Sequence, residues 1–160
     1  MDPNPFAVLS LIVAPAILTN ASSVLIMSTS NRLARAVDRA RELSRQLEDA
    51  AGYGTPKAQR RLQELAASER RALLLLRGLR SFYVALGGFA TAALVSLFGA
   101  VLAPLETVKA VTAMEILGAI AGLVAVGALI HGSVLLLRET RIAVQILSQR
   151  AATVRERADP

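Results

Sequence analysis

The stretch of sequence that decides the fold is residues 81–105, SFYVALGGFATAALVSLFGAVLAPL, which contains no charged residue. Two further stretches, residues 3–31 and 116–137, are also free of charge. Each stretch exceeds the roughly 20 apolar residues that an α-helix needs to cross the hydrocarbon core of a bilayer. The sequence therefore predicts an integral membrane protein with three crossings and argues against a soluble enzyme.

The expected fold is all-α. Three transmembrane helices continue into a cytoplasmic helical hairpin and a C-terminal helix, which together form a three-helix bundle. Pro15 lies inside the first crossing, where it removes a backbone hydrogen bond and favours a kink. The expected segments are the first transmembrane helix 1–30, the hairpin 31–81, the second transmembrane helix 82–104, a short external loop 105–113, the third transmembrane helix 114–137 and the cytoplasmic C-terminal helix 138–160.

The composition favours one small membrane domain and limits the available chemistry. The chain has 160 residues, of which 54% are hydrophobic, and its mean hydropathy is +0.49. It contains no cysteine, which excludes disulfides and thiol catalysis, and its single histidine, His131, argues against a histidine metal cluster. No catalytic motif is present, so we expect no enzyme activity, no catalytic residue, no cofactor and no metal.

The distribution of charge predicts the orientation in the membrane. The segment between Arg32 and Arg80 holds twelve Lys and Arg against six Asp and Glu, and the tail after Leu137 adds five Arg. Because basic segments stay on the cytoplasmic side, we expect the N-terminus outside and the C-terminus in the cytoplasm of a bacterial inner membrane. The N-terminal residues 1–5 lack the basic leader of a cleavable signal, so we expect none.

Small and apolar residues recur at intervals of three and four on both sides of a glycine-rich turn, which predicts two packed helices. The turn is residues 52–56, Gly-Tyr-Gly-Thr-Pro, in which Thr55 is expected to cap the returning helix and Pro56 to begin it. The outgoing set is Leu33, Ala36, Ala40, Leu43, Leu47 and Ala50, and the returning set is Leu62, Leu65, Ala72, Leu76 and Leu79.

Two groups of residues within the crossings are candidates for helix contacts. Thr19, Asn20 and Ser23 lie in the first crossing, where they predict either an interhelical hydrogen bond or the lining of a pore. A second group consists of small residues that allow two helices to approach closely, either within one chain or between copies. Its members are Gly88, Ala92, Ser96, Gly118 and Gly122.

The densest polar cluster lies where the three crossings meet the charged sequence. We interpret it as an orientation anchor with salt bridges, as a site for anionic lipid headgroups, or as a gate at a pore mouth. Glu139 is expected to pair with Arg32 or Arg35, and Asp38 with Arg35 or Arg41. The members of the cluster are Asn31, Arg32, Arg35, Asp38, Arg39, Arg80, Arg138 and Glu139.

Three segments resemble a known family. They are Pro-Ala-Ile-Leu at 15–18, Ser-Asn-Arg-Leu at 30–33 and Val-Asp-Arg-Ala-Arg-Glu-Leu at 37–43. They resemble the bacterial membrane family called domain of unknown function 2721, whose members are similar in having a proline in the first membrane helix and two further crossings. Residues 69–71 and 138–139 also match in position. The resemblance covers most of the chain and implies topology, but it implies no activity.

The sequence favours a non-enzymatic multipass membrane protein that acts by assembly, as a homo-oligomer or as an accessory subunit of a membrane complex. Its cytoplasmic helices would present the contact surface. The alternative is a homo-oligomeric ion channel or small-solute pore lined by the polar face of the first crossing. Nucleic acid is not an expected partner, although the net charge is +6, because basic and acidic residues interleave at helical spacing. The expected partners are membrane lipids, further copies of the chain and other membrane subunits.

Overall fold

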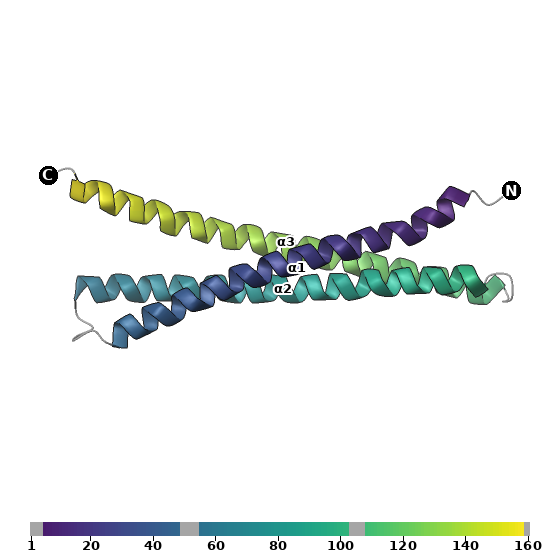
Figure 1. Ribbon diagram of the computed structural model, residues 1–160, viewed down its shortest axis with the longest axis horizontal. Helices are drawn as coiled ribbons and strands as arrows, with labels where there is room; N and C mark the ends of the chain where they lie inside the picture. Colours follow the sequence, from purple (N-terminus) through teal and green to yellow (C-terminus); the bar gives the residue numbers. More distant parts are fainter. Residues whose placement is uncertain (1–4, 49–54, 103–107, 159–160) are drawn as a thin grey trace. The chain divides into compact units, whose positions relative to one another are not determined.

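The fold consists of three long helices in a computed structural model that describes residues 5–48, 55–102 and 108–158. The helices are α1 (Pro5–Glu48), α2 (Pro56–Leu102) and α3 (Val108–Ala158), each drawn as a coiled ribbon in Figure 1. All three are long and apolar enough to cross a membrane. The all-helical class and the three apolar helices are therefore confirmed. Side chains are described over 13–48, 55–102 except Lys57, and 109–148 except Ala110 and Leu147.

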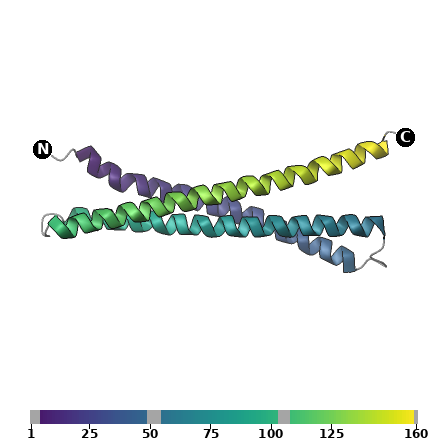
Figure 2. The same cartoon turned by 180° about the vertical axis from the view of Figure 1, so that it is seen from behind.

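Each helix is continuous across the change between apolar and charged sequence, where no proline intervenes. They contain 44, 47 and 51 residues, more than twice the roughly 20 that a crossing needs. Figure 2 shows α3 as one helix from its green to its yellow end. Pro15 lies inside α1, and the helix continues through it. The kink expected at Pro15 stays a prediction.

Local sequence explains where α2 and α3 begin. The Thr55 hydroxyl accepts a hydrogen bond from the N–H of Ala58 at 3.2 Å, and Pro56 is the first residue of α2. The predicted cap at Thr55 is thus confirmed. Helix α3 begins at Val108, earlier than the loop expected over 105–113 allows, because residues 108–113 contain no glycine or proline. The predicted turn residues 52–54 and Pro104 lie outside the described residues.

The chain divides into two compact units, and each contains part of every helix. We call the first, Met1–Met27 with Leu79–Gly132, the membrane unit. The second, Ser28–Gly78 with Ser133–Pro160, is the polar unit. On α1 and α3, the polar unit begins a few residues before the first charged residue that follows the apolar stretch. These charged residues are Arg32 on α1 and Arg138 on α3. The division therefore follows the change from apolar to charged sequence.

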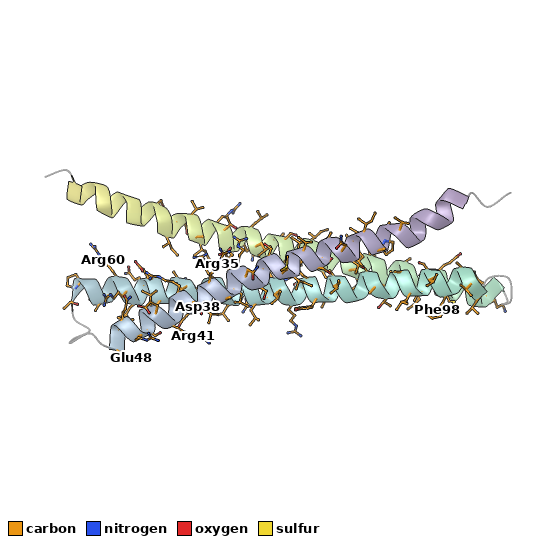
Figure 3. All side chains as sticks on the ribbon, viewed as in Figure 1. Arg35, Asp38, Arg41, Glu48, Arg60 and Phe98 are labelled. Atoms are coloured by element: carbon orange, nitrogen blue, oxygen red, sulfur yellow. The ribbon has the colours of Figure 1, made fainter. Side chains whose placement is uncertain are left out.

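Small residues allow α2 and α3 to pack closely in the membrane unit. Its core is formed by Ala85, Phe89 and Ala125, with Leu18 of α1 packed against it. A Cβ added at Gly88 would lie 2.8 Å from the Cβ of Ala125, so the two backbones approach too closely for a larger residue. Many other large side chains of this unit are exposed, and Phe98, labelled in Figure 3, is 55% exposed. An apolar exterior of this kind suits contact with lipid.

The core of the polar unit confirms the predicted stripe on α1 and corrects the one on α2. Leu43 and Leu47 of α1 are buried, as expected, whereas Leu62 and Leu76 of α2 are exposed. The buried face of α2 is instead offset toward Ala58, Ser68 and Leu75. The periodic pattern missed this face because its centre is polar. Among the other predicted positions, Ala36 is buried, Leu33, Ala40, Leu65, Ala72 and Leu79 are half-buried, and Ala50 lies outside the described residues.

Candidate functional site

A buried carboxylate joins the three helices of the polar unit. The side chain of Glu139 on α3 has no exposed surface. Its Oε2 accepts a hydrogen bond from Nη2 of Arg32 on α1 at 2.8 Å. Its Oε1 accepts a hydrogen bond from Nε of Arg71 on α2 at 2.8 Å, and Nη2 of Arg71 lies at 2.8 Å from the same oxygen. Each oxygen of the buried carboxylate therefore has a charged donor, as a buried charge requires.

Thr140 completes the polar contacts of Arg32. Its hydroxyl donates to the carbonyl of Leu136 at 2.9 Å, which leaves the oxygen lone pairs available as acceptors. Nη2 of Arg32 lies 3.2 Å from that oxygen. Arg32 thus contacts α3 through two successive residues, and its rotamer is held on that side of α1.

The pairing of Glu139 confirms one part of the sequence expectation and adds one residue that it missed. Arg32 is the predicted partner, and Asp38 pairs with Arg41 at 3.9 Å as the three-residue spacing indicated. Arg71 was not predicted as a partner. Its only sequence signal was its position in the family-like segment 69–71, because the depth at which α2 returns cannot be read from α2 alone.

Beside this carboxylate lies a basic cavity of about 190 Å³ in the polar unit. We call it the arginine cavity. Its wall on α1 carries Arg32, Arg35 and Arg39, and α2 supplies Arg71. The three α1 positions follow the three-four helical spacing, so they share one face. The remaining lining residues are Ala36 and Ser68.

The charges around the arginine cavity are unbalanced. Arg32 and Arg71 bind Glu139, and Nη2 of Arg39 donates to Oε2 of Glu64 at 3.1 Å. Arg35, labelled in Figure 3, is exposed and has no ion pair within the part of the chain that the structure describes. Four guanidinium groups therefore face two carboxylates, and the cavity keeps a positive potential.

The other members of the predicted boundary cluster lie away from this cavity. Asn31, Asp38 and Arg138 are exposed in the polar unit and do not line it. Arg80 is exposed and belongs to the membrane unit. Of the predicted cluster, Arg32, Arg35 and Arg39 therefore line the arginine cavity, together with Ser68 and Arg71.

The polar unit also has a larger, apolar groove between α1 and α2, with a volume of about 810 Å³. We call it the apolar groove. Leu73 and Leu76 on its α2 side are 54% and 52% exposed, respectively. Charged residues from both helices also line it. The residues that line it are Leu33, Val37, Ala40, Arg41, Ser44, Arg45, Glu48, Leu65, Glu69, Ala72, Leu73 and Leu76.

The polar residues of the first crossing behave differently from one another. Thr19 donates its hydroxyl hydrogen to the carbonyl of Pro15 at 2.8 Å, and Ser23 donates to the carbonyl of Thr19 at 3.1 Å. Asn20 is exposed on the side of α1 that also exposes Ile17 and Val24. Among the described residues, no hydrogen bond joins Asn20 to a sister helix. The amide of Asn20 is therefore presented outward, amid apolar side chains.

Two further polar residues of α1, Ser22 and Thr29, are buried. Ser22 is buried and donates to the carbonyl of Leu18 at 2.8 Å. Thr29, in the polar unit, is also buried, and its hydroxyl has no hydrogen-bond partner among the described residues. The four-residue spacing of hydroxyl to carbonyl was the available sequence signal for Ser22.

The predicted small residues divide by their surroundings. A Cβ added at Gly118 would contact Val95 at 3.5 Å, and the Oγ of Ser96 lies 3.9 Å from the same position. Gly88 contacts Ala125, and Ala92 is buried. For Gly122, no described atom beyond the adjacent residues and the surrounding helix backbone lies within 4 Å of the added Cβ. Contacts within the chain therefore account for this group except Gly122.

Among the described residues, no cluster of three or more histidine and acidic side chains has the arrangement of a metal site.

Comparison with known proteins finds similar sequences in one family. Residues 12–149 match the family described as "Protein of unknown function (DUF2721)". No curated protein and no solved structure matches the chain.

Proposed function

This chain belongs to the DUF2721 family, and we propose that it is a non-enzymatic membrane subunit that acts by assembling with further copies of itself. The observation that carries the proposal is the apolar groove of the polar unit. The groove exposes Leu73 and Leu76 within the charged half of the chain, where we expect water rather than lipid outside. Exposed apolar surface rimmed by charged residues is typical of a protein contact site.

The expected partner of the apolar groove is the same groove on a second copy. Two copies inserted in one membrane share an orientation. A two-fold axis perpendicular to the membrane therefore places each residue at the same depth as its counterpart in the other copy. Leu73 and Leu76 would then pack against their counterparts. Arg41 and Arg45 of α1 and Glu69 of α2 also line the groove, and they supply both signs of charge for such a contact.

The membrane unit supports the same proposal through Asn20. An amide facing hydrocarbon without a hydrogen bond costs roughly 4–8 kcal/mol on the water-to-cyclohexane scale. Asn20 is exposed in the single chain, and its side-chain amide has an NH₂ group that donates and a carbonyl oxygen that accepts hydrogen bonds. Two copies that meet at this face would satisfy each other's amides, which is a known way to hold membrane helices together.

A homo-oligomeric channel is the second candidate, because Asn20 and Ser23 are both exposed at about the depth of the middle of the first crossing. In that case several copies would turn these residues toward a water-filled axis. The two candidates differ in what surrounds Asn20. A sister helix covers it in a closed assembly, whereas water reaches it in a pore.

Measurement of particle size tests the assembly proposal. The full chain is purified in mild detergent and in nanodiscs, and its mass is measured by light scattering. We expect the wild type to contain more than one copy and Leu76→Asp to shift it toward the monomer. Leu62→Asp is the matched control, because Leu62 is also an exposed leucine of α2 but does not line the groove. A wild type that is monomeric in both environments would refute the proposal.

Accessibility of position 20 separates assembly from a channel. The chain has no native cysteine, so Asn20→Cys is a unique label site. Assembly predicts disulfide crosslinking between copies and no modification by a charged, water-soluble thiol reagent. A channel predicts modification together with a change in conductance across planar bilayers, with Val24→Cys as the control on the same exposed side of α1.

A further inference from the structure

We infer that the arginine cavity is a binding site for a phosphate group. This inference does not depend on self-assembly, because every residue that lines the cavity belongs to one chain. The cavity of about 190 Å³ is much larger than the roughly 30 Å³ that one water molecule occupies in the liquid. The space therefore suits a group of several heavy atoms rather than a single solvent molecule.

The surrounding donors match the chemistry of phosphate. Guanidinium groups present planar pairs of N–H donors that bind phosphate oxygens in bidentate fashion. Arg35 has no ion pair in the described part of the chain, so its donors are available to a ligand. Arg32 and Arg71 are only 34% and 30% exposed, and Glu139 fixes one edge of each. Such preorganisation reduces the entropy that binding costs.

Ser68 gives the cavity a directional donor in addition to its charge. Its side chain belongs to the buried face of α2, where the residue is only 6% exposed. A hydroxyl in this position can donate to a phosphate oxygen at little entropic cost, since the side chain has few rotamers. The combination of Ser68 with Arg35 distinguishes a built site from a general basic surface.

Two kinds of molecule carry the required group: an anionic phospholipid headgroup and a soluble phosphate. Arg32 is the first charged residue after the uncharged stretch 3–31, so this end of α1 leaves the apolar sequence near the cavity. A headgroup is therefore within reach. The chemistry at the cavity is the same for both sources, and the experiment is designed to tell them apart.

The test uses the full chain in maltoside micelles, which contain no phosphate. In one arm, inorganic phosphate is titrated and binding is followed by calorimetry. In the other arm, phosphatidylglycerol or phosphatidylcholine is added, and bound lipid is counted by native mass spectrometry. The variants are Arg35→Gln and Ser68→Ala, neither of which removes a bond to Glu139. Thermal unfolding of each variant checks that it is folded.

Arg60→Gln is the matched control. It makes the same change of charge in the polar unit, at an exposed arginine of α2 that does not line the cavity (Figure 3). We expect Arg35→Gln to weaken binding roughly tenfold, the usual effect of losing one charge-assisted hydrogen bond. Ser68→Ala should weaken it severalfold, and Arg60→Gln should leave it within a factor of two.

The outcome also identifies the source of the phosphate. Retention of phosphatidylglycerol over phosphatidylcholine, with no binding of inorganic phosphate, supports a lipid headgroup site. Saturable binding of inorganic phosphate that Arg35→Gln weakens supports a soluble ligand. The inference is overturned if Arg35→Gln and Ser68→Ala bind both probes as tightly as the wild type. It is also overturned if Arg60→Gln weakens binding as much as Arg35→Gln, because the effect would then reflect net charge alone.

Discussion

Gly132 of α3 lies directly against the ring of Phe82 of α2: a Cβ added at Gly132 would be 2.6 Å from Cε1 of that ring. Phe82 is fully buried, so its ring has little room to move. We predict that Gly132→Ala destabilises the protein by about 1–3 kcal/mol, the usual cost of overpacking a core. Thermal unfolding in detergent measures it. Gly127→Ala is the control, because no described atom beyond the adjacent residues and the surrounding helix backbone lies within 4 Å of its added Cβ. Equal melting temperatures for the two variants would contradict this packing.

Glu139→Gln is predicted to lower the free energy of unfolding of the polar unit by roughly 3–5 kcal/mol, because it breaks a buried ion pair and leaves two arginines without their charged partner. Double-mutant cycles with Arg32→Gln and with Arg71→Gln should each give coupling energies of about 1–3 kcal/mol. Both arginines bond Glu139 at 2.8 Å. The cycle with Arg35→Gln should give a coupling close to zero, since Arg35 does not bond Glu139. Coupling to Arg35 as large as that to Arg71 would refute the described geometry.

Leu75→Asp is predicted to expose the polar unit to proteolysis. Leu75 has no exposed surface, so a carboxylate there would be buried without a partner, which costs several kcal/mol. Limited trypsin digestion follows the loss of structure through cleavage between Arg32 and Arg80. Leu62→Asp, at a position that is 43% exposed, should be cleaved at the wild-type rate. If Leu75→Asp resists trypsin as well as the wild type does, the described face of α2 is wrong.

The expected orientation is testable with single cysteines. We predict that Asn4→Cys reacts with an impermeant thiol reagent added outside intact cells, whereas Gly54→Cys reacts only after the cells are opened. The physical reason is the excess of Lys and Arg between Arg32 and Arg80. The native chain serves as the control, since it has no cysteine. Labelling of Gly54→Cys alone from outside would reverse the topology.

Features that depend on neighbouring residues in the chain were predictable from the sequence. The three apolar helices, the cap at Thr55 and the pair of Asp38 with Arg41 each follow from local spacing. The pair of Arg32 with Glu139 could also be predicted, because both residues lie where an uncharged stretch ends.

Features that depend on the rotation and register of one helix against another were not predictable. Leu62 and Leu76 lie at the helical spacing expected of core residues, yet they are exposed. The buried face of α2 instead contains Ser68, and Arg71 of the same helix bonds Glu139. Apolar periodicity does not detect a buried polar face. Asn20 similarly gave no signal that it would be exposed rather than bonded to a sister helix.

The hydroxyl groups of Thr19, which is half-buried, and of Ser23, which is exposed, have a consequence for any molecule that contacts this part of α1. Each already gives its only hydrogen to a backbone carbonyl four residues earlier. Their oxygens therefore offer lone pairs alone, and any neighbour there must bring the hydrogen or a positive charge. The amide of a second Asn20 meets that demand through its NH₂ group. In a pore, the same wall would favour the passage of cations over anions.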